Sequence, residues 1–368
     1  MKNTAWTGTF QPSSPNSPST DTLIMAVRYG VPYKGSKNQI AEWIVSQFPK
    51  RKNFYDLFAG GCAVTHRAML TNKFENFVIN DISDVPSLFL GAVNGKYAEE
   101  KRWISREDFY SLKGKDPYIR YCWSFGNNGK DYLYSKEIEP WKKALHYARL
   151  FNDFSLLKEF GIKTDRADSM TVKKNADEWK KKYIGWAKIH FRFTEEEIEK
   201  YDQYKKEGIF ENLVPGSVGL QQLKKRLKSL ESLESLQSLQ SLQRLQSLES
   251  LESLESLQSF QGSYEDITIK PASVIYCDIP YRNTDGYGEG CFDYERFYNW
   301  CEKQTEPLYI SEYRMPPDRF ECVASVEKSV TLCNGSDKKA VEKLFVPKAQ
   351  IKRKIAEIKK EPVQLELF

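Results

Sequence analysis

The fold is decided by NFYDLFAGGC at residues 53–62, which joins a short apolar stretch to an acid and a pair of glycines. A helix-like segment at residues 63–71 follows, and NFVIN at residues 76–80 then leads to Asp81. The order strand, glycine turn, helix and strand is typical of a parallel sheet in an α/β protein. Glycines let the backbone approach a ligand, and an acid ending the second strand suits ribose hydroxyls. Such turns also occur in α/β proteins that bind no nucleotide, so the stretch alone leaves both interpretations open.

A second stretch, VIYCDIPY at residues 274–281, carries an acid and an aromatic ring to the end of another apolar strand. Open α/β sheets bind ligands at the carboxyl ends of their strands. Asp278 can accept a hydrogen bond from an amino group, and the carbonyl of Ile279, which precedes Pro280, is a second acceptor. Tyr281 can stack on a base. Two acceptors beside a stacking ring would orient an amine for in-line attack on a methyl group, whereas a plain acidic turn closed by Pro-Tyr is the alternative.

The composition narrows the class of protein without identifying it. Lys and Arg number 55 against 50 Asp and Glu, a net charge of +5 that neither demands nor excludes a polyanionic partner. The seven cysteines form no Cys-x-x-Cys pair and there are three histidines, so we expect no disulfide framework and no metal site. With no 18-residue apolar run and no signal-peptide core, we expect a soluble protein of the reducing cytoplasm.

A repeat interrupts the chain between these stretches. From Leu227 to Phe260 every third residue is Leu, with Phe at the last position. Three residues turn an α-helix by only about 300°, so the Leu row drifts around the helix. A short solenoid and a helix buried on changing sides both remain possible. We expect no role in chemistry, since expansion by replication slippage explains such a repeat.

The ordered combination of these stretches resembles the DNA adenine methylase (Dam-like) family of amino-group, S-adenosylmethionine-dependent DNA methyltransferases. DIPY at 278–281 is similar to the Asp-Pro-Pro-Tyr motif of that family, and residues 56–62 resemble its Asp/Glu-x-Phe-x-Gly-x-Gly loop. YKGSK at 33–37 stands where the family has an aromatic residue and Gly-Gly-Lys. RYCWSFGNNG at 120–129 resembles the basic, aromatic and Asn/Gly-rich middle element, and YISE at 309–312 a later strand.

The resemblance implies a Rossmann-like methyltransferase sheet of the α/β class, with a helical inserted target-recognition region to which this chain adds the Leu-rich repeat. It implies that S-adenosylmethionine is bound by Tyr33, Lys37, Asp56, Phe58, Gly60 and Asp81. It assigns Asp278, Ile279, Pro280 and Tyr281 to an adenine flipped out of double-stranded DNA. Cys62 replaces a motif glycine, which would tighten the cofactor turn, whereas Ile279 replaces a proline and keeps the backbone carbonyl.

Composition and resemblance together divide the chain into six expected parts. These are a disordered tail (1–24), a cofactor-binding part (25–95), a target-recognition region (96–226), the Leu-Ser-Glu/Gln repeat (227–262), a catalytic part (263–347) and a basic C-terminal tail (348–368).

Other functions fit the same residues. Methylation of the cytosine N4 amine uses the same acceptors, although Asp rather than Ser at 278 favours adenine. A catalytically dead DNA-binding protein of this fold is possible, and an RNA or small-molecule methyltransferase fits the long middle region less well. The recognised DNA site, and whether a restriction–modification partner exists, are left open.

The C-terminus adds one candidate partner. Gln364, Leu365, Leu367 and Phe368 resemble the Gln-Leu-x-Leu-Phe pentapeptide by which bacterial proteins dock on the replication sliding clamp. A free end after a charged run can extend into a groove, while folding back onto the chain's own core is the alternative.

Overall fold

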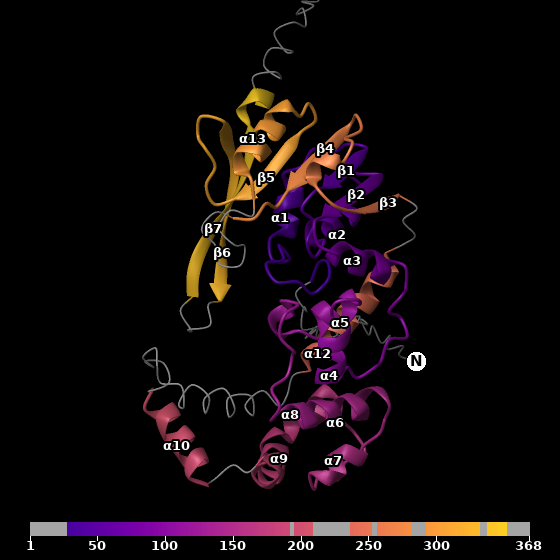
Figure 1. Cartoon of the computed structure of the whole chain (residues 1–368), viewed down its shortest axis with the longest axis vertical. Helices are drawn as coiled ribbons and strands as arrows, with labels where there is room; N and C mark the ends of the chain where they lie inside the picture. The colour runs from indigo at the N-terminus through magenta and orange to yellow at the C-terminus, as the bar shows by residue number, and fades with distance from the viewer. Residues whose placement is uncertain are drawn as a thin grey trace, which may run out of the picture.

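The computed structural model describes residues 28–191, 195–208, 236–251, 256–281, 292–331 and 337–351. A seven-stranded sheet in the order β3-β2-β1-β4-β5-β7-β6 forms its centre (Figure 1). β3, β2, β1, β4 and β5 are parallel neighbours, whereas β7 pairs antiparallel with both β5 and β6. The strands are β1 (Asn53–Asp56), β2 (Asn76–Asp81), β3 (Leu257–Gln261), β4 (Ser273–Cys277), β5 (Leu308–Glu312), β6 (Phe320–Thr331) and β7 (Asp337–Pro347).

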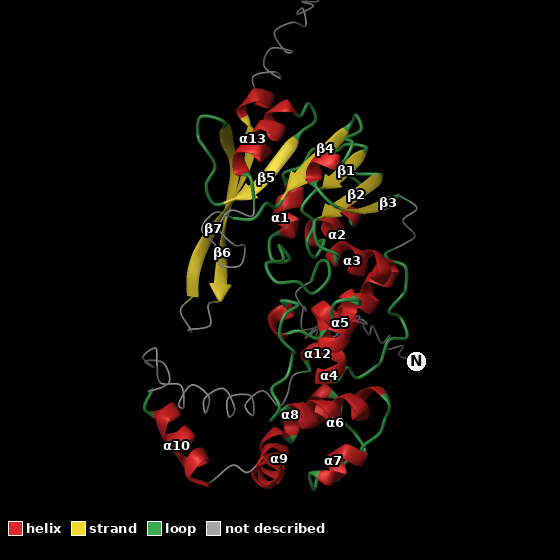
Figure 2. Ribbon diagram, viewed as in Figure 1, coloured by secondary structure: helices red, strands yellow, loops and turns green. Residues whose placement is uncertain are grey.

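Helices accompany the sheet and also form a separate helical part, which lies below the sheet in Figure 2. α1 (Ala41–Ser46), α2 (Ala63–Met69), α3 (Val85–Val93) and α13 (Tyr294–Lys303) belong to the sheet region. The helical part contains α4 (Arg106–Leu112), α5 (Pro117–Cys122), α6 (Glu139–Leu150), α7 (Ser155–Glu159), α8 (Ser169–Lys174), α9 (Ala176–Phe191) and α10 (Glu195–Lys206), and α12 (Gln237–Gln246) contacts α3 and α5.

The core of the sheet follows from alternation along its buried strands. Neighbouring strand residues point to opposite faces. Phe54 and Tyr276 pack into a large cluster with the N-terminal helices, whereas Tyr55, Ile275 and Cys277 pack into a second cluster on the other face. Every residue of β1 and β4 is buried, so both faces of these central strands are covered, and a ligand can be met only by the turns that follow their carboxyl ends.

The predicted α/β fold is confirmed, with differences at the edges of the sheet. The apolar residues Ile267 and Ile269 lie outside the sheet: they follow a 3-10 turn (Tyr264–Asp266), and their side chains pack on the second cluster. The antiparallel pair β6 and β7 was not predicted, although its alternating pattern is typical of a strand with one exposed face.

The described part of the Leu repeat is a helix followed by a strand of the sheet. Five repeat leucines point inward, each at most 7% exposed: Leu236, Leu239, Leu242, Leu245 and Leu248. The last of them lies in a 3-10 turn (Ser247–Ser250) that continues α12, and three residues per turn keep a period-3 row on one side. The next described triplets form β3, which pairs with β2. The repeat therefore contributes to the core and to the sheet.

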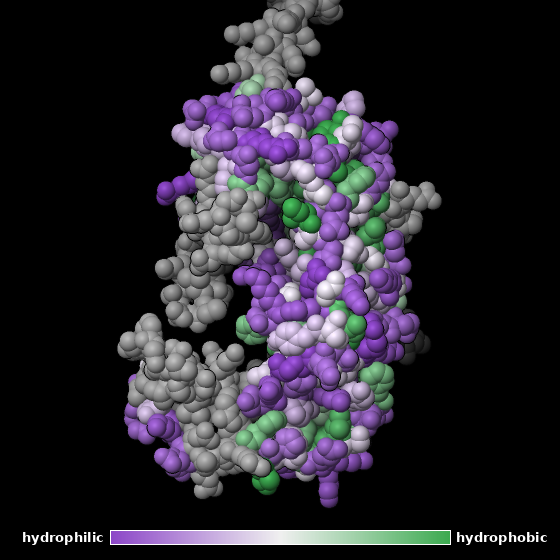
Figure 3. All heavy atoms as spheres, in the orientation of Figure 1, coloured by the Kyte–Doolittle hydropathy of each residue, from purple (hydrophilic) through white to green (hydrophobic). Residues whose placement is uncertain are grey.

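The face seen in Figure 3 is mostly hydrophilic, with hydrophobic residues in small groups. Among the described residues, no helix combines the length and the apolar character that a membrane crossing requires. The tail at 1–24, the first triplets of the repeat and the C-terminal pentapeptide lie outside the described residues.

Candidate active site

The glycine turn after β1 is tied to both neighbouring strands. The amide of Leu57 donates to the carbonyl of Tyr276 at 3.0 Å, and that of Ala59 donates to Asn80 at 2.9 Å. Asp81 Oδ2 accepts a hydrogen bond from the Gly60 amide at 2.8 Å. The acid that ends the second strand therefore holds the turn as well as facing it, because its carboxylate supplies the acceptor that the exposed amide needs.

Cys62 occupies the last position of this turn in a left-handed conformation, with φ 56° and ψ 31°. This region favours glycine, since a Cβ there crowds the following carbonyl. The Cys62 side chain is fully buried, and burial raises the pKa of its thiol well above the ordinary value. Cys62 is therefore a neutral packing residue at a backbone position that suits the glycine of the family motif.

Tyr33 lies directly on the glycine turn. A Cβ on Gly60 would stand 3.0 Å from Tyr33 Cε1, and one on Gly61 would stand 2.8 Å from Tyr33 Cβ. Only glycine allows this close approach. The Tyr33 ring also meets the edge of Tyr121, with ring centroids 5.7 Å apart. The structure thus brings together Tyr33, Gly60 and Asp81, three of the six residues expected at a cofactor.

Asp56 ends β1 as a nearly fully buried carboxyl group, 1% exposed. Its Oδ2 accepts a hydrogen bond from the Thr65 hydroxyl at 2.7 Å, while Oδ1 has no partner among the described residues. Burial raises the pKa of Asp56 to about 7, and the hydrogen bond from Thr65 opposes that rise. A buried carboxyl oxygen at the start of the glycine turn therefore has no hydrogen-bond partner among the described residues.

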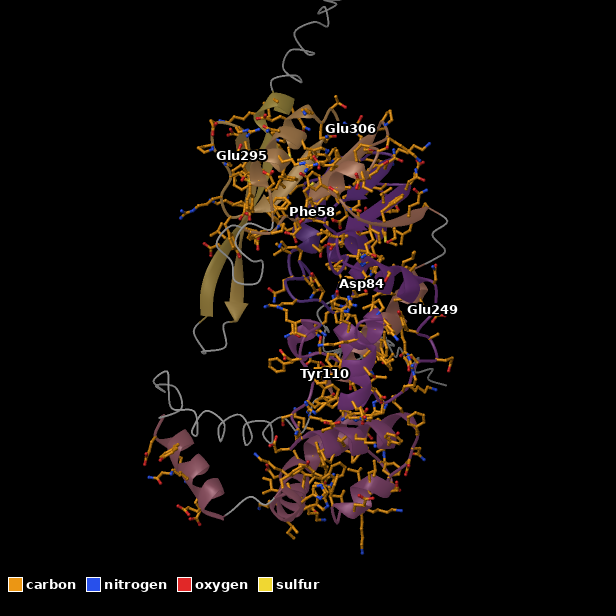
Figure 4. The ribbon with its side chains drawn as sticks, viewed as in Figure 1. Phe58, Asp84, Tyr110, Glu249, Glu295 and Glu306 are labelled. Atoms are coloured by element: carbon orange, nitrogen blue, oxygen red, sulfur yellow. The ribbon has the colours of Figure 1, made fainter. Side chains whose placement is uncertain are left out.

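Phe58, labelled in Figure 4, packs against the second cluster, on the face of the sheet that carries Tyr55 and Ile275, where it has aromatic neighbours. Its ring centroid is 5.3 Å from that of Tyr264 and 5.7 Å from that of Phe297. Phe58 is only partly buried by these contacts. It supports the turn from one side and keeps part of its ring accessible to a ligand.

Ile82, the residue after Asp81, is 84% exposed, although its side chain is apolar. Asp81 Oδ1 accepts from both the amide and the hydroxyl of Ser83, at 2.9 and 2.7 Å, which fixes the chain on either side of Ile82. An exposed apolar side chain beside an acid at the end of a parallel strand suits an aromatic ring of a ligand. The sequence interpretation missed Ile82, because its exposure depends on the tertiary structure.

The acidic turn after β4 is paired with a residue from the start of the chain. Lys37 Nζ forms an ion pair with Asp278 Oδ1 at 2.8 Å, and the two side chains are 9% and 19% exposed. Burial acts to lower the pKa of Lys37, but the carboxylates of Asp278 and Glu342 outweigh it and the pKa is raised. Lys37 therefore stays protonated, and it contacts Asp278 of the acidic turn rather than the glycine turn.

Tyr281 is held by three neighbours. Its hydroxyl donates to Glu342 Oε2 at 2.7 Å, its ring meets the edge of Tyr313 at 4.7 Å, and Lys37 Nζ lies 4.5 Å from the ring centroid. Glu342, on β7, is 1% exposed. The sequence interpretation missed Glu342 because β7 was not predicted. It missed Tyr313, which directly follows β5, because nothing local marks this residue.

The remaining two residues of the acidic turn support it. Ile279 is 2% exposed and packs into the second cluster. The carbonyl of Pro280 accepts a hydrogen bond from the hydroxyl of Tyr294 at 2.9 Å. The side chain of Ile279 is thus an anchor in the core, which agrees with a role assigned to its backbone alone.

The middle element approaches the site through Asp84, which lies between the sheet and α4 in Figure 4. Asp84 Oδ1 accepts hydrogen bonds from Arg120 Nη1 at 2.8 Å and from the hydroxyl of Tyr121 at 3.2 Å. The chain then turns through a 3-10 segment (Phe125–Asn127), where the Phe125 side chain is 66% exposed. The helical part is therefore anchored just after the end of β2, beside the glycine turn.

No group of His, Cys, Asp and Glu side chains in the described part of the chain could hold a metal ion. Positioned acids, backbone amides and aromatic rings at the carboxyl ends of β1, β2 and β4 make up the site.

Residues 33–157 match the model of the D12 class N6 adenine-specific DNA methyltransferase family. No curated protein matches the chain. The matched range contains Tyr33, Lys37, the glycine turn, Asp81 and the middle element, so the resemblance to Dam-like adenine methyltransferases is confirmed there. Over this range the chain is similar to adenine-specific DNA methyltransferases, which are transferases whose substrate is DNA.

Proposed function

We propose that this enzyme transfers a methyl group from S-adenosylmethionine to the N6 amine of an adenine flipped out of double-stranded DNA. One observation carries the proposal: the glycine turn after β1 and the Asp278–Tyr281 turn after β4 end adjacent, directly paired strands. A cofactor on the first turn and a base on the second would therefore meet at the same edge of the sheet.

The residues of the first turn fit S-adenosylmethionine. Asp81 offers a carboxylate to ribose hydroxyls, Ile82 an apolar surface to the adenine ring, and Asp56 Oδ1 a hydrogen-bonding atom to a polar group of the methionine part. The turn that Gly60 and Tyr33 form gives close access to the backbone. When bound, the cofactor supplies an electrophilic methyl group.

The residues of the second turn would capture and orient the amine. The Asp278 carboxylate and the Ile279 carbonyl would each accept a hydrogen bond from one N–H of the amine. The nitrogen lone pair is then directed away from these two acceptors and toward the methyl group. Tyr281, fixed by Glu342 and Tyr313, provides a face or edge for the base. Lys37 holds Asp278 in place, and removing a base from the duplex costs a few kcal/mol that these contacts must repay.

Incubation of the protein with tritiated S-adenosylmethionine and duplex DNA, followed by nucleoside analysis, tests the proposal. We expect label in N6-methyladenine. Label in N4-methylcytosine would move the reaction to the other amine, and absence of label with bound DNA would indicate an inactive DNA-binding protein.

We further propose residues 96–226 as the target-recognition region, since that region carries the exposed Phe125 and is tied to the site through Asp84. The free, mostly buried thiols of the described cysteines are compatible with a reducing compartment such as the cytoplasm.

For the C-terminal pentapeptide we propose docking on the sliding clamp, which rests on the sequence alone. A labelled peptide of the last ten residues should bind the clamp in a fluorescence-polarisation assay. Equal binding after Leu367→Ala and Phe368→Ala would exclude the proposed apolar anchors.

A further inference from the structure

The repeat helix α12 departs from its own pattern at one residue that reaches the cofactor side. The neighbouring triplets read LQS or LES, with Ser in the third position. In the triplet at residues 242–244, LQR, Arg244 takes the place of this Ser. Its Nε donates to the carbonyl of Gly30 at 2.6 Å, and its Nη2 donates to the carbonyl of Tyr29. The guanidinium group is therefore directed at the loop that precedes Tyr33.

That loop rests directly on the glycine turn. The amide of Val31 donates to the carbonyl of Gly61 at 2.8 Å, and the amide of Gly30 donates to Nδ1 of His66, on α2, at 2.9 Å. A Cβ on Gly30 would stand 2.1 Å from the Gly61 carbonyl oxygen, so no side chain fits between the two segments. A displacement of residues 29–31 would therefore displace the glycine turn or separate Tyr33 from it.

Burial disfavours the charged form of the Arg244 side chain. Burial lowers the pKa of Arg244 to about 10, and Arg28 adds to this effect, so the interior does not favour the cation by itself. The carbonyls of Tyr29 and Gly30 compensate, because hydrogen bonds from a charged donor are stronger than neutral ones. His66 stays neutral below Gly30, since burial, with a smaller effect of Arg244, lowers its pKa to about 4.

We propose that Arg244 is a positioning residue for cofactor binding, which clamps residues 29–31 onto the glycine turn so that Tyr33 covers Gly60 and Gly61. The inference rests on the proposed use of S-adenosylmethionine at this turn. The repeat then has two separable roles: its leucines fill the core, and its single arginine sets the geometry of the cofactor site.

The test compares Arg244→Met with Gln243→Met, a matched change at the preceding, exposed residue of the same helix. Calorimetry with S-adenosylmethionine on the full chain should give a dissociation constant raised roughly tenfold for Arg244→Met, as expected for lost hydrogen bonds to a charged donor. Turnover at saturating cofactor should fall far less. Gln243→Met should match the wild type in both, and Arg244→Lys should recover part of the affinity, because one ammonium reaches one carbonyl.

This pattern separates positioning from mere stability. A variant that only unfolds more easily has fewer active molecules, yet the folded molecules bind the cofactor with unchanged affinity. Gly30→Ala, which forces the same loop away from Gly61, should reproduce the loss of affinity with Arg244 intact.

Unchanged affinity in folded Arg244→Met, or a loss shared equally by Gln243→Met, would overturn the inference. Failure of the wild-type protein to bind S-adenosylmethionine would instead overturn the proposed function.

Discussion

The glycine turn after β1 and the acidic turn after β4 end neighbouring strands, yet different parts of the chain hold them. The side-chain hydrogen bonds of the glycine turn join residues close in sequence, Asp56 with Thr65 and Gly60 with Asp81, although Arg244 holds the adjacent residues 29–31 from a distance. The acidic turn relies on distant ones: Asp278 on Lys37 near the start of the chain, and Tyr281 on Glu342 of β7. Both turns leave a recognisable sequence motif, but only folding brings the acidic turn its supporting residues. Substitutions in each turn distinguish these two kinds of support.

Asp278→Ala should have the largest effect on methyl transfer. Loss of the acceptor that orients the amine is expected to reduce turnover by about 10³-fold, the upper range for removal of one oriented polar group. Affinity for S-adenosylmethionine should stay close to that of the wild type, because the glycine turn is built independently. Transfer assays with tritiated cofactor and calorimetry measure the two quantities, and near-wild-type turnover would remove Asp278 from the mechanism.

Glu342→Ala should reduce turnover by about 10²-fold, the loss expected when a base-contacting group is misplaced by about an ångström. The variant leaves the Tyr281 hydroxyl without its acceptor and Lys37 with one less negative neighbour. Glu342→Gln keeps an oxygen for Tyr281 and should lie between Ala and wild type. Glu321→Gln on β6, which changes a half-exposed glutamate ion-paired with Lys348, is the matched control. Equal activity of Glu342→Ala and this control would show that β7 plays no part in the site.

Asp81→Ala should weaken binding of the cofactor and leave capture of the target base unchanged. It removes the acceptor of the Gly60 amide and the proposed ribose contact, with hydrogen bonds to a charged acceptor contributing roughly 1.5–3 kcal/mol. Calorimetry should show the corresponding rise in the dissociation constant for S-adenosylmethionine. An unchanged constant would place the ribose elsewhere.

Asp56→Asn should change how stability depends on pH. The folded-state pKa of Asp56 is about 7 against an ordinary value of 3.8, so the folded protein binds more protons between these values and stability falls as pH rises through this window. His66, whose folded-state pKa is lowered to about 4, makes stability rise with pH below its ordinary pKa, which opposes the effect of Asp56. Only the difference in stability between variant and wild type therefore isolates Asp56. That difference in melting temperature, in favour of Asn, should grow from pH 4 to pH 7 and then level off. A constant difference would show that Asp56 is not held neutral.

The Cys62→Gly variant should have a higher melting temperature than Cys62→Ala, the reverse of the usual order. Alanine usually stabilises relative to glycine because it restricts the unfolded chain. At a left-handed position, however, a Cβ costs roughly 1–2 kcal/mol, so glycine should melt at the higher temperature here. Thermal denaturation of the two variants measures this, and the usual order would mean that the turn does not require the left-handed conformation.

The amino-acid sequence by itself determined the α/β class, the strands β1, β2, β4 and β5, and the residues of both turns, because short apolar runs ending in an acid or glycine encode them locally. It could not predict the partner of Asp278, the support of Tyr281 or the exposure of Ile82, since these depend on which distant segments meet. The repeat shows the same limit. Its period of three is ambiguous along the chain, and only packing against α3, α5 and β2 made it a helix, a 3-10 turn and an edge strand. In the sequence Arg244 is only an irregularity of the repeat. The fold places it against the carbonyls of Tyr29 and Gly30.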